Sequence, residues 1–156
     1  MKKFKFLFFA ILILIVTLAC SLLVPSTSAG STSGKGVSGL TPKSSGVIDR
    51  VTMAKGTQGD GLDPVNPTTV FATTDTFHAV VHVVNAQQDT DIKAMWYVVS
   101  TSAESNKLID TSNFTATGSG NVDFTLAPNS AWPVGSYQVE CYVNNALDQV
   151  INFSVK

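Results

Sequence analysis

The sequence has few of the residues that build reactive sites. It contains two histidines and two cysteines, and only 13% of its 156 residues are charged. Cys20 lies in an apolar run and Cys141 lies far downstream, so the chain after that run has one thiol and no internal disulfide. Cys141 alternates with apolar residues and has no basic neighbour to stabilise a thiolate. This pattern predicts a buried, inert side chain.

Positive charge is also scarce. Three of the ten Lys and Arg residues lie within the first five positions, and all eleven Asp and Glu residues lie after residue 29. The chain after residue 29 therefore carries seven cations against eleven anions. A nucleic-acid surface needs clustered Lys and Arg, so this balance argues against a nucleic-acid partner. It argues equally against electrostatic docking of this part onto anionic lipid.

The few polar groups do not form a catalytic pattern. His78 and His82 lie four residues apart on a predicted strand, which is roughly 13 Å along it. That distance is too long for one metal ion, whose ligands lie about 2 Å from it. No serine is singled out by a neighbouring base, and "GTQGDG" lacks the lysine of a phosphate-binding loop. We therefore predict neither an enzyme nor a cofactor.

One segment contains oxygen ligands at short spacing. "GTQGDGLDPVNP" (56–67) holds Asp60, Asp63 and Asn66, the residue types that Ca²⁺ prefers. It lacks the bidentate glutamate and the spacing of an EF-hand. We interpret it as a surface turn, with Asp60, Asp63 and Asn66 as weak calcium candidates.

Residues 1–25 have the layout of an export signal or a membrane anchor. Three lysines precede an apolar run from residue 6 to 24. "TLAC" resembles a bacterial lipobox and makes Cys20 a candidate for lipidation. "STSA" followed by Gly30 offers cleavage after Ala29 instead. The run is also close to the ~20 residues that span a bilayer, so an uncleaved anchor is the third alternative.

All three alternatives predict export, with the chain after residue 30 on the outer face of a membrane, at the cell surface or secreted. Residues 26–46 are mostly Ser, Thr and Gly and bury too little apolar surface to offset the entropy of ordering. They are predicted to be a disordered, flexible linker.

The remaining chain, residues 47–156, alternates with period two between turn signals and shows no sustained helical period. The count and spacing predict an all-β, antiparallel β-sandwich of about seven strands. The expected strands are 47–55, 75–85, 91–100, 106–110, 121–127, 135–144 and 147–156.

Alternation assigns residues to the two faces of each strand. The side of Tyr137 and Cys141 is predicted to face inward, and the side of Gln138, Glu140 and Tyr142 outward. Further inward residues are expected to be Ile92, Ala94, Trp96, Val98, Val122, Phe124, Leu126, Leu147, Ile151, Phe153 and Val155. The opposite face of the third strand, with Met95, Tyr97 and Val99, is also apolar. It predicts cover by loops or an exposed partner site.

The segment "WPVGSYQVECYVNNALDQVINFSV" and the preceding "AMWYVV" resemble an immunoglobulin-like domain of bacterial surface lipoproteins. The resemblance covers residues 47–156. It implies that Trp96 is the core tryptophan and Tyr137 the corner tyrosine of such a sandwich. The usual inter-sheet disulfide is missing, because Cys141 has no partner.

These features predict a non-enzymatic, extracytoplasmic interaction or structural module, attached to the membrane by its N-terminus. A protein partner is expected at the loops or at an outer sheet face. The alternative is a secreted ligand-binding or calcium-binding domain of the adhesion type.

Overall fold

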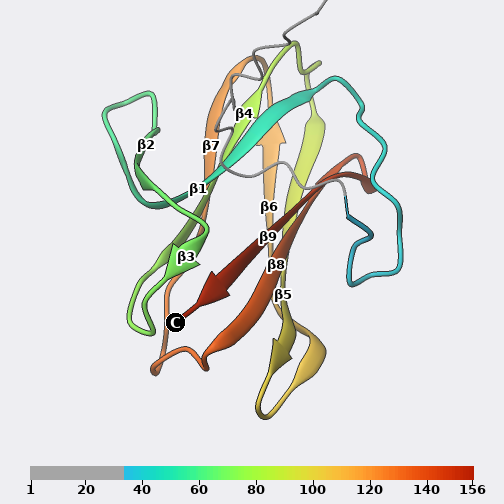
Figure 1. Cartoon of the computed structure of the whole chain (residues 1–156). Helices are drawn as coiled ribbons and strands as arrows, with labels where there is room; N and C mark the ends of the chain where they lie inside the picture. Colours follow the sequence, from blue (N-terminus) through green and yellow to red (C-terminus); the bar gives the residue numbers. More distant parts are fainter. Residues whose placement is uncertain (1–33) are drawn as a thin grey trace, which may run out of the picture.

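The computed structural model describes residues 34–156, which form two packed β-sheets (Figure 1). The predicted signal or anchor at residues 1–25, Cys20, Ala29 and Gly30 lie outside the described residues. Within residues 34–156, no helix is long and apolar enough to cross a membrane. The strands are β1 (Ile48–Gln58), β2 (Asp63–Pro67), β3 (Val70–Phe71), β4 (Phe77–Val83), β5 (Thr90–Thr101), β6 (Ser105–Ala116), β7 (Gly120–Leu126), β8 (Gly135–Val143) and β9 (Ala146–Val155).

The strand order is that of an immunoglobulin-like sandwich. One sheet has the order β2-β1-β4-β7 and the other β3-β9-β8-β5-β6. Neighbouring strands are antiparallel except β3, which pairs in parallel with β9. The order β1-β4-β7 against β9-β8-β5 corresponds to strands A-B-E against G-F-C of that architecture. The prediction of an all-β sandwich is therefore confirmed.

The core lies between the two sheets and follows the predicted alternation. Trp96 and Cys141 are fully buried, and Tyr137 is almost so. The phenol of Tyr137 donates a hydrogen bond to the carbonyl oxygen of Pro133 at 2.6 Å, which closes the corner between the loop and β8. These are the positions expected for the core tryptophan and the corner tyrosine.

Aromatic rings fill one end of this core. The ring of Phe77 stacks on Trp132, with centroids 4.7 Å apart, and meets Phe153 edge-on at 4.9 Å. Trp96 meets Phe153 edge-on at 6.1 Å. Such pairs add to the stabilisation that burial of their area provides.

Three details differ from the predicted strands. The structure has nine strands instead of seven, and the two additional ones are β2 and β3. Neither was predicted, because β2 contains two prolines and β3 has only two residues. β6 continues to Ala116, beyond the predicted end at residue 110. The extension was not predicted, because the Thr, Ser and Asn residues of this exposed strand show no apolar alternation. Leu147 faces outward, not into the core. A register shift between Cys141 and Tyr142 reverses the side on which it lies.

Candidate functional site

The segment that precedes β1 lies on the outer face of the five-stranded sheet, over β8 and β9. Residues 34–47, here called the strap, run along β8 and β9 and are drawn in blue and cyan at the right of Figure 1. The strap binds mainly through its backbone. The N–H of Val37 donates to Oε1 of Gln138 at 2.7 Å, and the N–H of Ser38 donates to Oε1 of Glu140 at 2.9 Å.

The later part of the strap is bound to the β8–β9 hairpin. The N–H of Lys43 donates to the carbonyl oxygen of Leu147 at 3.0 Å, and the N–H of Ser45 donates to Oδ2 of Asp148 at 2.5 Å. The prediction of a flexible linker over 26–46 is therefore wrong for residues 34–46. Buried polar side chains of the sheet provide the acceptors for this segment, a source of order that apolar content alone does not reveal.

The strap explains why the predicted outward residues of β8 are buried. Gln138 is 4% exposed, Glu140 0% and Tyr142 4%. The second carboxylate oxygen of Glu140 accepts a hydrogen bond of 2.5 Å from the phenol of Tyr142. The amide nitrogen of Gln138 donates to Asn152 at 2.7 Å. Each of these three buried side chains thus has at least one hydrogen-bond partner.

Gly36 is required where the strap crosses Glu140. A Cβ on Gly36 would lie 2.4 Å from Oε1 of Glu140, well inside contact distance. Because the Glu140 carboxylate is fully buried and held from two directions, it has little room to move away. By contrast, a Cβ on Gly34 would lie 3.7 Å from the side chain of Asn152, an ordinary contact.

The covered face also includes the apolar side of β5. Tyr142, Leu147 and Val150 form a second cluster, against which Met95 packs. Tyr97 is buried there, and Lys93 places Nζ 4.7 Å from the ring centroid of Tyr142. For this face the sequence predicted either cover by loops or an exposed partner site. In the structure Tyr97 is buried, and Met95 and Val99 are half-buried, so the face is largely covered.

Burial keeps the tyrosine phenols and the cysteine thiol of this region protonated. Burial, followed by the hydrogen bond to Glu140, raises the pKa of Tyr142 to about 12. Burial and then the charge of Glu140 raise the pKa of Tyr97. Burial, with the charges of Asp148 and Glu140, raises the pKa of the Cys141 thiol to about 12. None of these groups provides a nucleophile at neutral pH, because the reactive form is the deprotonated one.

The histidines lie on the outer face of the other sheet, and each is hydrogen-bonded to β7. Nδ1 of His78 lies 2.8 Å from Oδ2 of Asp123, and Nδ1 of His82 lies 2.8 Å from Oδ1 of Asn121. The hydroxyl of Thr125 approaches the same nitrogen of His78 as Asp123 does, at 3.5 Å. A nucleophile–base–acid relay needs the hydroxyl at the other ring nitrogen, so this group has the wrong geometry for one.

The calcium candidates are spread along the β1–β2 hairpin. Asp60 lies in its turn, Asp63 begins β2 and Asn66 follows in that strand, and all three are exposed. Within residues 34–156, no group of three or more His, Cys, Asp and Glu side chains is placed to hold a metal ion. The hairpin turn packs on the sheet instead, where the amide nitrogen of Asn121 donates to the carbonyl oxygen of Gly61 at 2.8 Å.

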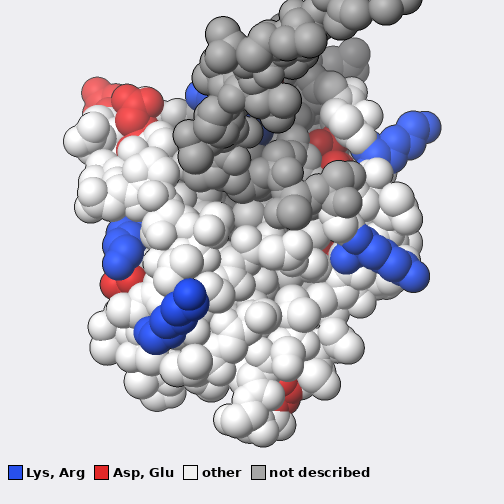
Figure 2. Space-filling view, viewed as in Figure 1, with Lys and Arg blue, Asp and Glu red and all other residues white. Residues whose placement is uncertain are grey.

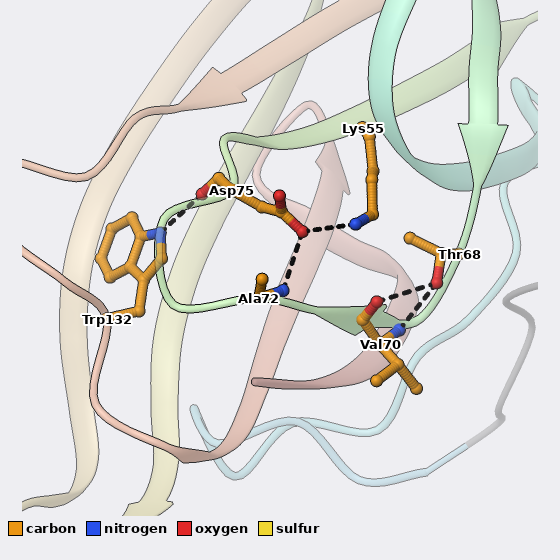
Figure 3. A network of polar contacts seen from close by, with 6 residues as sticks. All are labelled: Lys55, Thr68, Val70, Ala72, Asp75 and Trp132. Atoms are coloured by element: carbon orange, nitrogen blue, oxygen red, sulfur yellow. Dashed lines mark hydrogen bonds and ion pairs between the residues drawn. The ribbon is translucent and has the colours of Figure 1, made fainter. Parts of the chain in front are cut away.

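A polar network that the sequence did not reveal fixes the crossing between the two sheets (Figure 3). Oδ2 of Asp75 accepts from the N–H of Ala72 at 2.7 Å and lies 2.7 Å from Nζ of Lys55. The indole N–H of Trp132 donates to the carbonyl oxygen of Asp75 at 2.8 Å. The hydrogen bond with Lys55, and then that with Ala72, lowers the pKa of Asp75.

The side of the sandwich between β6 and β7 is hollowed. One cavity of about 320 Å³ lies between Phe114 and Ala116 of β6 and Val122 of β7. Another, of about 450 Å³, lies between Ile109 of β6 and Leu126 of β7. Charged residues of both signs are spread over the face drawn in Figure 2.

Residues 34–156 thus form an immunoglobulin-like β-sandwich with one strap-covered face and one hollowed edge. No family model and no curated protein matches the chain. The CARDB domain of a Pyrococcus furiosus protein, solved in complex with di-metal ions, matches with 13% identity and a TM-score of 0.39, over 69% of this chain and 94% of that one. The Pseudomonas fluorescens alkylpurine DNA glycosylase AlkC, bound to DNA containing an abasic site analog, matches with 10% identity and a TM-score of 0.41. That match covers 68% of this chain and 30% of the glycosylase. Likeness at this level assigns no function to the chain.

Proposed function

We propose that the protein is a non-enzymatic binding module held on the outer face of a membrane by its N-terminus. The proposal combines the export pattern of residues 1–25 with the chemistry of the domain. Its histidines are bound to Asp123 and Asn121, and its folded-domain thiol is buried. We expect the domain to bind other molecules through its edge strands, its surface cavities and its loops.

The observation that carries the proposal is the binding of the strap to the sheet. The strap leads from the predicted attachment into the domain, and its N–H groups are held by Gln138, Glu140 and Asp148. Only the residues before Gly34 are left to act as a linker. A short linker would hold the domain near the membrane in a restricted orientation, which suits a module that meets partners at the same surface.

Lipidation of Cys20 is the form of attachment that we propose. The experiment compares the wild-type chain with Cys20→Ala in membrane and soluble fractions of expressing bacteria. We expect the wild type in the membrane fraction, digestible by protease added outside. Cys20→Ala should move to the soluble fraction or accumulate unprocessed, because it removes the site of all the acyl chains, and stable anchoring takes more than one of them.

Cys141→Ala is the matched control, because it removes a cysteine that is buried in the sandwich. It should partition like the wild type. If Cys20→Ala also partitions and migrates like the wild type, lipidation is wrong and an uncleaved anchor takes its place. A wild-type chain found wholly in the medium, beginning at Gly30, would support the secreted alternative.

A further inference from the structure

The free edges of the two sheets differ in their ability to pair with another strand. Within residues 34–156, the end strands are β2, β7, β3 and β6. β3 has two residues, and β2 contains Pro64 and Pro67, which have no N–H to donate. β6 is the longest end strand, with twelve residues. Exposed edges of this kind pair with other chains unless charge, proline or a bulge prevents it.

Only the first half of β6 has such protection. Ile109 is bulged out of the ladder, since Trp96 pairs with Asp110 and Tyr97 pairs with Leu108. Lys107 is charged and forms an ion pair with Glu104. The second half, Thr111–Ala116, reads "TSNFTA" and contains no charge, proline or glycine. Its pairing with β5 is regular throughout.

An aromatic side chain stands on this unprotected half. Phe114 is 45% exposed, although it pairs with the fully buried Ile92 and so lies on the inner side of its sheet. It borders the cavity of about 320 Å³ between β6 and β7. The second half of β6 therefore combines free backbone groups with apolar surface at the same place.

We propose that two copies of this chain pair through β6, antiparallel and with Phe114 opposite Phe114 of the second copy. Residues directly opposite each other in an antiparallel pair share one face of the sheet. A two-fold axis perpendicular to the sheet keeps the inner faces of both copies on the same side. Residues that face inward must then lie opposite residues that face inward. The two-fold axis therefore passes beside one residue, which lies opposite the same residue of the second copy.

The register centred on Phe114 agrees best with the sequence. It places the two exposed rings together beside their cavities, where each covers the other. The remaining opposite pairs would be Asn113–Thr115, Ser112–Ala116 and Thr111–Thr117. No charged residue occurs between Thr111 and Asn121, so this pairing brings no like charges together. In the protected half, the bulge at Ile109 interrupts any equivalent register.

Such a pairing is short, and its affinity in dilute solution is expected to be weak. Attachment to a membrane would raise the effective concentration of one copy around another and strengthen it. That last step rests on the proposed function, whereas the pairing itself does not.

The first experiment tests the register by disulfide trapping. Phe114→Cys in the full chain, purified in detergent and oxidised with copper phenanthroline, should form at least about five times more disulfide dimer than the wild type. The wild type reports any disulfide through Cys20, and Cys141 is buried. Asn113→Cys alone should remain at the wild-type level, because its opposite residue is Thr115. A mixture of Asn113→Cys and Thr115→Cys chains should cross-link.

The second experiment leaves Phe114 intact. Sedimentation equilibrium of the wild type in detergent should show a monomer–dimer equilibrium, and Asn113→Lys should raise its dissociation constant about tenfold or more. Ser102→Lys, in the β5–β6 turn, is the matched control and should leave it unchanged. A wild type that stays monomeric, or trapping of Asn113→Cys equal to that of Phe114→Cys, would overturn the proposal. Neither assay depends on membrane attachment, so failure of the proposed function leaves both unaffected.

Discussion

The backbone N–H of Ser38 donates a hydrogen bond of 2.9 Å to Oε1 of Glu140, a fully buried carboxylate on the outer side of β8. The two residues are 102 positions apart. This contact makes residues from 34 onward part of the folded domain. It also means that Glu140 depends on the strap, because a buried carboxylate without its donors is strongly destabilising.

Gly36→Ala should weaken the strap without disturbing the core. The added Cβ would lie 2.4 Å from Oε1 of Glu140, and relieving this overlap should cost about 1–3 kcal/mol in the free energy of unfolding. Trypsin should then cut after Lys43 faster than in the wild type. Gly34→Ala is the matched control and should behave like the wild type. Equal cleavage rates for the two variants would mean that the strap does not need this close contact.

Trp96→Ala should destabilise the domain by about 3–5 kcal/mol, because it empties a fully buried aromatic site. Trp96→Phe should cost clearly less. Within the described part of the chain, the indole N–H of Trp96 is buried without a hydrogen-bond partner, so phenylalanine removes an unpaired donor along with part of the ring. Urea unfolding of both variants measures the difference. A cost below about 1 kcal/mol for alanine would contradict the packing described here.

Asp75 should make stability depend on pH in the acidic range. Its pKa is lowered in the folded state from 3.8, so the unfolded chain binds the proton more tightly. The contribution of the carboxylate is present above the unfolded pKa and is lost as pH falls through the folded one. We expect the stability advantage of the wild type over Asp75→Asn to shrink between pH 6 and pH 3. The change should be about 1 kcal/mol or less, because the pair is partly exposed.

Unfolding measured at several pH values checks the prediction for Asp75. Asp63→Asn, in the exposed β1–β2 hairpin, serves as the control. A difference between the wild type and Asp75→Asn that stays constant from pH 6 to pH 3 would show that the carboxylate does not gain from the contacts with Lys55 and Ala72.

Cys141 should be inert to thiol reagents as long as the domain is folded. Its thiol is fully buried and its pKa is raised to about 12, so little thiolate forms at pH 8. In a Cys20→Ser background, labelling with iodoacetamide should follow the unfolded fraction across a urea titration. Rapid labelling without denaturant would indicate that the β8–β9 side opens far more readily than its packing suggests.

The sequence predicted the parts of the fold that alternation controls. In β8, alternate residues from Tyr137 to Val143 face the core as expected, and the inner residues of β5 and β7 do so as well. Alternation failed where the ladder itself is irregular. A register shift after Cys141 turns Leu147 outward, and no local pattern signals that shift. The second half of β6 was missed because neither of its faces is consistently apolar.

The candidate site was less predictable, because it depends on contacts between distant parts of the chain. A Ser- and Gly-rich composition correctly indicates little apolar burial. It gives no sign that Gln138, Glu140 and Asp148 will accept hydrogen bonds from that segment. The one available signal was in β8, whose outer side combines Gln138 and Glu140 with Tyr142 next to an apolar β5 face. A segment packed over that face would explain both the polar residues of β8 and the apolar residues of β5.

The most direct test of the account is the intact mass of the protein recovered from the membrane, cytoplasmic and medium fractions of expressing bacteria. Lipidation predicts a chain that begins at Cys20 and carries the added mass of its acyl groups. An unmodified chain beginning at Gly30, recovered from the medium, or a full-length chain recovered from the cytoplasm would contradict a membrane-attached module.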